Sequence, residues 1–229
     1  ILLSGVMALL AMYSGQEDIV VGTPVSGRTH PDTEQMLGMF VNTLALRGKP
    51  AREKSFESFL MEMKETCLKA FANQEYPFEE LISHIEVNDD MSRNPLFDVM
   101  FVLQNTENAE FVLEGSTVTG AVTESTVAKF DMTLHVAEAN GEFYFDLEYC
   151  TDIYKENSMQ WMLTHYLHLL EQALDNPDNK LADYEMATMQ ERETILNTFQ
   201  NIVEFGECQT VTEQFLAQVK KTPDNIAVI

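Results

Sequence analysis

Basic side chains are scarce in this sequence. The 229 residues include 14 Lys and Arg against 37 Asp and Glu, which gives a formal net charge of −23 at pH 7. A surface of that sign repels phosphate backbones and anionic lipid headgroups alike. We therefore expect no nucleic acid and no membrane among the partners of this protein.

Cysteine is also rare, and its spacing argues against a disulfide or metal framework. The three cysteines lie far apart, at Cys67, Cys150 and Cys208, and no two of them form a C-x-x-C pair. An odd number of widely spaced thiols favours a reducing, cytoplasmic setting with buried thiols.

Long hydrophobic runs are missing. The apolar opening, residues 1–13, has no basic leader and no convincing cleavage site, and it is shorter than the roughly 20 residues that a membrane span needs. It predicts a buried helix. Because this helix opens without a capping residue, we expect the chain to begin part-way into an element and to be a fragment.

Familiar catalytic and phosphate-binding motifs are missing as well. Ser26 lies in Pro-Val-Ser-Gly rather than in a G-x-S-x-G elbow, and the segment from Gly22 to Gly27 lacks the Lys-Ser/Thr pair of a phosphate-binding loop. No two of the five histidines are adjacent; they are His30, His84, His135, His165 and His168.

Two histidine arrangements invite a functional interpretation. His165 and His168 are three residues apart on a predicted helix, with Glu171 one turn further on, close enough to share a metal ion. No third ligand follows at a known spacing, so we favour solvated surface histidines. His135 lies on one strand face with Asp131, as a carboxylate-oriented base would, but no nucleophile is near it in sequence. We assign no catalytic residue and no metal ligand.

The rest of the chain is organised around two strands and the turn between them, within residues 19–47. Gly22 and Gly27 flank Pro24, whose ring fixes its own φ. The backbone between the two glycines can therefore turn sharply and approach a neighbouring group closely. Arg28 leaves this turn as a fork of donors suited to a carboxylate or to backbone carbonyls.

The second of these strands carries an amide among apolar residues. It runs from Gly38 through Asn42 and Thr43 towards Arg47. A buried amide needs hydrogen-bond partners. We expect both Asn42 and Arg28 to be buried or half-buried and to make several hydrogen bonds.

Two further segments complete a set of motifs. They are Asn73-Gln-Glu-Tyr-Pro-Phe-Glu79 and Met91-Ser-Arg-Asn-Pro-Leu-Phe97. With Val21–Arg28 and Gly38–Thr43, and in this order, they resemble the second half of the condensation domains of nonribosomal peptide synthetases. The resemblance implies residues that line a substrate tunnel or hold its loops: Gly22, Pro24, Gly27, Arg28, Gly38, Asn42, Thr43, Gln74, Pro77, Arg93, Asn94 and Pro95.

The resemblance also implies a fold. It is an α+β, chloramphenicol-acetyltransferase-like fold, in which two α/β halves, each a mixed sheet with helices packed on it, enclose a substrate tunnel. This chain would be the C-terminal half over residues 1–177, with a linker over 178–209. Residues 210–229 resemble the start of an adenylation domain.

Hydrophobic spacing adds local predictions. Amphipathic helices are expected over 55–71, with Ser55 as N-cap, and from 157 to 174, with Asn157 and Gln160 as a capping box. A shorter helix with Pro77 as its first residue follows the first of these. Strands are expected at 97–103 and in a hairpin closed by Asn140-Gly141 as a type I′ turn. An edge strand broken at Gly120 is expected within 105–128.

In the condensation family, the amine of one carrier-bound aminoacyl thioester attacks the carbonyl of another. The catalytic signature His-His-x-x-x-Asp-Gly belongs to the N-terminal half and does not occur here. The resemblance implies part of a peptide-bond-forming enzyme that is inactive alone and binds no cofactor itself. The phosphopantetheine would be carried by partner carrier domains.

The implied partners are the N-terminal half of the same condensation domain, peptidyl carrier proteins and the following adenylation domain. Two alternatives stay open. One is a non-catalytic scaffold or docking half for the carrier protein and the adenylation domain. The other is an epimerisation or cyclisation relative of the same fold.

Overall fold

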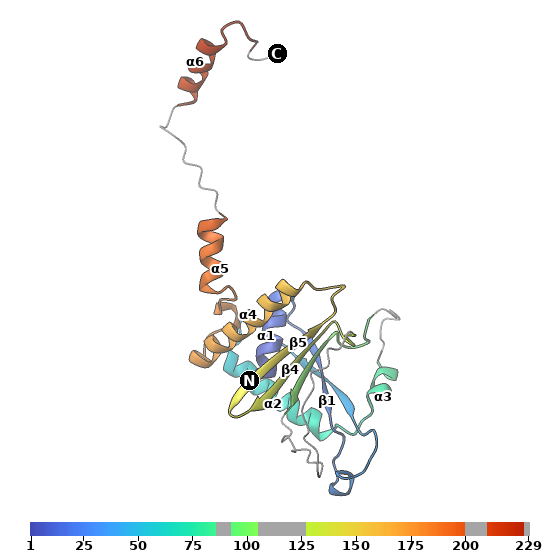
Figure 1. The fold of residues 1–229 in the computed structure, drawn as a ribbon. Helices are drawn as coiled ribbons and strands as arrows, with labels where there is room; N and C mark the ends of the chain where they lie inside the picture. Colours follow the sequence, from blue (N-terminus) through green and yellow to red (C-terminus); the bar gives the residue numbers. More distant parts are fainter. Residues whose placement is uncertain (86–92, 105–126, 200–209, 227–229) are drawn as a thin grey trace, which may run out of the picture. The chain divides into compact units, whose positions relative to one another are not determined.

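The computed structural model describes residues 1–85, 93–104, 127–199 and 210–226 (Figure 1). The chain divides into two compact units, Ile1–Thr188 and Met189–Ile229. The described strands all belong to the first unit. The motifs identified above therefore belong to this unit too.

A five-stranded mixed sheet forms the centre of the first unit, with strand order β2-β1-β3-β4-β5. Its strands are β1 (Ile19–Val25), β2 (Asn42–Gly48), β3 (Val99–Gln104), β4 (Met132–Ala139) and β5 (Glu142–Tyr149). The pairs β1–β2 and β4–β5 are antiparallel. Strand β3 pairs in parallel with both β1 and β4, so it joins the two hairpins into one sheet.

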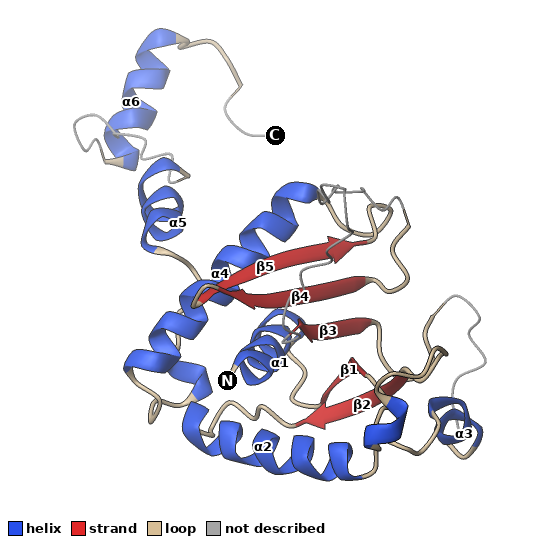
Figure 2. Cartoon of the chain, turned by 60° about the horizontal axis from the view of Figure 1, so that its bottom comes forward, coloured by secondary structure: helices blue, strands red, loops and turns tan. Residues whose placement is uncertain are grey.

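Three long helices cover one face of this sheet (Figure 2). They are α1 (Leu2–Ser14), α2 (Phe56–Ala72) and α4 (Glu156–Asp175), and the short helix α3 (Phe78–Ser83) contacts β2. Successive residues of a strand point to opposite faces. Alternate strand residues such as Leu134 and Val136 share one buried cluster with Phe59 of α2 and Tyr166 of α4. The core therefore lies between one sheet face and the three helices.

Two local predictions are confirmed. Asn140 and Gly141 both have positive φ, at 56° and 78°, as the hairpin turn requires. The side chain of Ser55 accepts a hydrogen bond from the backbone nitrogen of Ser58 at 3.2 Å, so Ser55 is the N-cap of α2. Both signals depend only on neighbouring residues.

The predicted start of α4 is wrong. The helix begins at Glu156 after Lys155, which has an extended backbone and provides no side-chain cap. Asn157 is therefore already inside the helix, where its side chain no longer faces the free N–H groups of the first turn. Gln160 donates instead to Glu156 at 3.2 Å. The helix after Pro77 also begins one residue late, at Phe78, because Pro77 has an extended backbone and is the N-cap.

The second unit contains helical segments. Helix α5 (Met189–Glu193) continues into a π-helical turn at Thr194–Thr198. Helix α6 (Val211–Lys221) opens with a capping box made by Thr210 and Glu213. The residues expected to form an edge strand, up to 126, lie outside the described part of the chain.

Other expectations concern thiols and membranes. Cys67 and Cys150 are free thiols, and both are half-buried. Cys208 lies outside the described residues. Among the helices that the structure describes, none combines the length and the hydrophobicity that a membrane span requires.

Candidate functional site

Arg28 holds the loop between β1 and β2 in shape. Its guanidinium donates to the carbonyl of Thr33 and, at 3.5 Å, to the carbonyl of Gly38. The same group lies 4.4 Å from the centre of the Phe40 ring, in a cation–π contact. The guanidinium of the half-buried Arg28 therefore binds groups of its own loop.

Gly27 makes this closed loop possible. Its φ of 65° is in the left-handed region, and an added Cβ would lie 1.8 Å from the carbonyl oxygen of Phe40. Gly38 has a φ of 156°, and a Cβ there would lie 3.2 Å from the Phe40 ring. The backbone around Phe40 is thus too close to Gly27 for any side chain.

Asn42, the first residue of β2, joins this hairpin to the segment ahead of α3. Its side-chain nitrogen donates to the carbonyls of Gln74 and Tyr76, each at 2.8 Å. Its side-chain oxygen accepts a hydrogen bond from the backbone nitrogen of Phe78 at 3.2 Å. Gln74 takes part through its carbonyl, while Pro77 sets the extended backbone before the helix. The amide is satisfied on both its donor and its acceptor side.

A second hydrogen bond strengthens this junction. Thr29 in the β1–β2 loop donates to the side chain of Glu75 at 2.7 Å. In the β1–β2 ladder, Thr43 lies opposite Pro24. Pro24 has no N–H to donate to a neighbouring strand. Strand β1 pairs with β3 at Gly22, which lies opposite Met100.

Phe97, in the fourth motif, packs on residues of the first and the third motif. An added Cβ at Gly22 would lie 2.1 Å from the Phe97 ring, so the missing side chain leaves the space that this ring fills. Phe97 is 5 % exposed, and its ring centre lies 5.6 Å from that of Phe78 and 5.7 Å from that of Phe130. One aromatic side chain thus contacts both earlier motifs.

The sequence prediction missed this role for Phe97. It placed Phe97 inside a strand, whereas β3 begins at Val99. A glycine within a strand often marks the close approach of another group, and Gly22 was such a signal. The partner's identity was not available from the sequence, because Gly22 and Phe97 are distant in the chain.

An ion pair lies beside Phe97. A guanidinium nitrogen of Arg93 is 3.8 Å from one carboxylate oxygen of Asp98. Asn94 and Pro95 follow Arg93 in the sequence. The other oxygen of Asp98 is buried and has no hydrogen-bond partner among the described residues.

Burial, with Asp131 and Asp98 nearby, raises the pKa of Tyr154, so its phenol is neutral at neutral pH.

The prediction of solvated histidines is wrong for His165. That side chain is 9 % exposed, and its Nδ1 lies 2.6 Å from the hydroxyl of Tyr13. The end of α1 covers this part of α4. The spacing of apolar residues within α4 does not reveal that contact. His135 lies opposite Val102 on one side and Asp146 on the other. No group of three or more metal-ligating side chains occurs among the residues that the structure describes.

The arrangement as a whole positions loops. The bonds between the motifs are made by an amide, a guanidinium and backbone groups, and the contacts are between aromatic rings. Neither an amide nor a guanidinium titrates near neutral pH. This cluster can therefore hold the loops that carry the motifs in a fixed position.

Comparison with known sequences gives a consistent result. The profile of the family described as "Condensation domain" matches residues 1–196. The chain is 45 % identical over its whole length to gramicidin S synthase 2 of Brevibacillus brevis and 41 % identical to tyrocidine synthase 2 of Brevibacillus parabrevis. It covers only 5 % and 6 % of those proteins, so it spans about one twentieth of their length.

Solved structures show the same fold. A four-domain nonribosomal peptide synthetase bound to AMP and glycine matches 98 % of this chain, which covers 18 % of that protein, with a TM-score of 0.79 and 21 % identity. The first condensation domain of the calcium-dependent antibiotic synthetase, in complex with a substrate analogue, matches 82 % of this chain with a TM-score of 0.68 and 19 % identity. There the chain covers 40 % of the solved protein.

Proposed function

The chain belongs to the condensation domain family of the nonribosomal peptide synthetases, and we propose that it is the C-terminal half of one such domain. It has the chloramphenicol-acetyltransferase-like α+β fold of that family. In the proposed reaction the amine of one carrier-tethered aminoacyl thioester attacks the carbonyl of another aminoacyl or peptidyl thioester. This half supplies a wall of the substrate tunnel, and the His-His-x-x-x-Asp-Gly motif comes from the other half.

The observation that carries this proposal is the meeting of the four motifs at one place. Asn42 binds the segment that contains Gln74 and Phe78. Phe97 lies on Gly22 and beside Phe78. Segments that are far apart in sequence thus form one ordered cluster, as a tunnel wall requires. The remaining candidate residues act in the same cluster by shaping its loops.

We assign residues 1–177 to the condensation half, 178–209 to a linker and 210–229 to the start of an adenylation domain. The working partners are the N-terminal half, peptidyl carrier proteins that bear phosphopantetheine, and the adenylation domain. The half-buried free thiols suit a reducing compartment, and we place the protein in the cytoplasm.

The test is reconstitution with two loaded carrier proteins. The 229-residue chain alone is expected to form no dipeptidyl thioester above background, as measured by mass spectrometry. A synthetase module that contains this chain and the upstream half is expected to form it. A module in which both histidines of the upstream motif are replaced is the control, and it is expected to be inactive. Product from the isolated chain would contradict the proposal and direct attention to His135.

Two other functions predict different products. A scaffold or docking half would leave the intact module inactive while the adenylation domain still loads its carrier. An epimerisation relative would invert the configuration of a tethered residue. A cyclisation relative would form a ring in the tethered product. Mass spectrometry and chiral analysis of the thioester-bound product together separate these outcomes. The bonds around Asn42 are compatible with each of them, so the product decides.

A further inference from the structure

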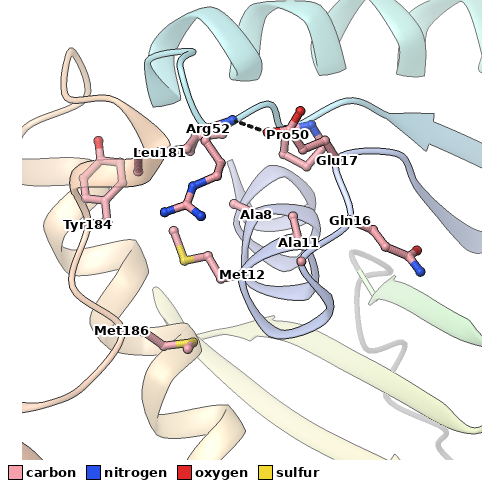
Figure 3. Close-up of a pocket in the computed structure, with 12 residues that line it drawn as sticks. Ala8, Ala11, Met12, Gln16, Glu17, Pro50, Arg52, Leu181, Tyr184 and Met186 are labelled. Atoms are coloured by element: carbon pink, nitrogen blue, oxygen red, sulfur yellow. Dashed lines mark hydrogen bonds between the residues drawn. The ribbon is translucent and has the colours of Figure 1, made fainter.

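A cavity of about 230 Å³ lies within the first unit, formed by other residues than the motif cluster (Figure 3). Its walls come from the end of α1, the residues that lead into β1, the chain after β2 and the segment 181–186. Pockets for drug-sized ligands measure roughly 300–1,000 Å³. This cavity suits a smaller molecule.

Two opposite charges line the cavity. The guanidinium of Arg52 points into it in Figure 3 and makes no hydrogen bond to any group in the described part of the chain. Glu17 lines it too, and one of its carboxylate oxygens accepts a hydrogen bond from the backbone nitrogen of Arg52 at 3.2 Å. That bond fixes the carboxylate close to the backbone of the residue that carries the cation.

The other walls are largely apolar. The side chains of Met12, Met186, Leu181 and Tyr184 line the cavity, together with Ala11 of α1. Methionine adapts its shape to irregular apolar partners. The cavity thus combines one cation, one anion and an adaptable apolar surface.

We propose that this cavity binds a free α-amino acid with an apolar side chain, such as leucine. At neutral pH the amino acid is a zwitterion, so its carboxylate pairs with Arg52 and its ammonium group with Glu17. The apolar side chain packs against the methionines and Leu181. A simple carboxylic acid is repelled by Glu17, and a simple amine is repelled by Arg52. A carrier-bound aminoacyl thioester has no free carboxylate, so this is a site separate from the proposed condensation reaction.

Binding would also fasten the segment 181–186. The backbone of this segment already donates from Leu181 to the carbonyl of Lys54 at 2.8 Å and from Ala182 to the carbonyl of Arg52 at 3.0 Å. A ligand in the cavity adds contacts between the same segment and α1. Because a ligand that binds only the folded state stabilises it by mass action, leucine is expected to raise the melting temperature.

The experiment is isothermal titration of the 229-residue chain with L-leucine, with a thermal melt in parallel. Two analogues test the two charges: 4-methylpentanoate lacks the ammonium group, and leucinamide lacks the carboxylate. We expect saturable leucine binding, and binding at least about tenfold weaker for each analogue, a factor equivalent to 1.4 kcal/mol. No saturable binding of leucine by the wild type would overturn the proposal.

Variants complete the test. Arg52→Gln and Glu17→Gln are each expected to weaken leucine binding about tenfold or more. The exposed Lys64→Gln on α2 is the matched control and is expected to bind as the wild type does. Ala11→Trp fills the cavity and is expected to abolish binding, with the fold checked by circular dichroism. Leucine binding that is unchanged in both Arg52→Gln and Ala11→Trp would show that it occurs elsewhere and would refute the site.

Discussion

Asn42 and Phe78 lie 36 residues apart and are joined by a hydrogen bond of 3.2 Å, from the backbone nitrogen of Phe78 to the side-chain oxygen of Asn42. The nitrogen of the same amide donates to the carbonyls of Gln74 and Tyr76. One side chain therefore fixes the end of β2 against the segment that begins α3. Its loss leaves three backbone groups without their partner.

Asn42→Ala is expected to lower the free energy of unfolding by about 1–3 kcal/mol, the range for leaving buried hydrogen-bonding groups unpaired. Urea titration of the chain measures this change. Asn73→Ala is the control, because the Asn73 side chain makes an exposed bond to Lys69 within α2, and it is expected to cost less.

The same variant is informative in the intact synthetase. There we expect Asn42→Ala to lower both the melting temperature and the condensation rate, while adenylation is unchanged. If condensation were lost at full stability, Asn42 would be a direct participant in the reaction, and the structural role would be wrong.

Gly22→Ala tests the contact with Phe97. The new Cβ would lie 2.1 Å from the ring, so we expect a destabilisation of about 1–3 kcal/mol from overpacking. Combining it with Phe97→Ala removes the clash, and the two effects should not add. A double-mutant cycle by urea titration measures the coupling. Gly15→Ala is the control, since no atom lies within 4 Å of its added Cβ and it should not couple to Phe97. Strict additivity for Gly22 would contradict the packing described here.

Arg28→Lys tests the closure of the β1–β2 loop. Lysine cannot reach two carbonyls with a planar fork, and it loses the flat stacking on Phe40. We expect a lower melting temperature and faster chymotryptic cleavage within residues 29–41. Arg47→Lys is the matched control, because Arg47 pairs with Asp18 at the other end of the hairpin. Equal cleavage of the two variants would argue against a special role for Arg28 in the loop.

The Asp18–Arg47 pair predicts an acid dependence of stability. The hydrogen bond from Arg47 lowers the pKa of the Asp18 carboxyl below its ordinary 3.8. The stabilisation from this pair is therefore complete above that value and is lost as the pH falls through the lowered folded-state pKa. We expect the stability difference between wild type and Asp18→Asn to shrink below about pH 4. Because the pair is exposed, added salt should reduce the difference at neutral pH as well. A difference that stayed constant down to acid unfolding would exclude this linkage.

An exposed apolar surface is the last feature with a direct test. Leu37 and Met39 of the β1–β2 loop are 102 % and 89 % exposed, and Met36 and Val41 beside them are also exposed. Apolar patches of this kind mark interaction surfaces or aggregation liabilities. We expect the isolated chain to bind a hydrophobic dye or to self-associate despite its charge. The double variant Leu37→Ser with Met39→Ser should reduce dye fluorescence, and an unchanged signal would place the dye elsewhere.

Much of the local structure followed from the sequence because its causes are local. The Asn140-Gly141 turn depends on the φ angles that two adjacent residues tolerate, and the Ser55 cap depends on an N–H three residues away. The motif residues were also found from sequence, through their resemblance to a family. At the start of α4 the N-cap is Lys155 rather than Asn157, so the predicted boundary was misplaced by two residues.

The site itself was decided by tertiary structure. Gly22 and Phe97 meet because β1 and β3 are neighbours in the sheet, and His165 is buried because Tyr13, 152 residues away, lies against it. Hydrophobic periodicity reports which face of an element is buried and says nothing about which distant residue covers it. The sequence alone therefore determined the family, the elements and the charge, while the folded chain decided the partners of each motif residue, since those contacts join segments that are remote in the chain.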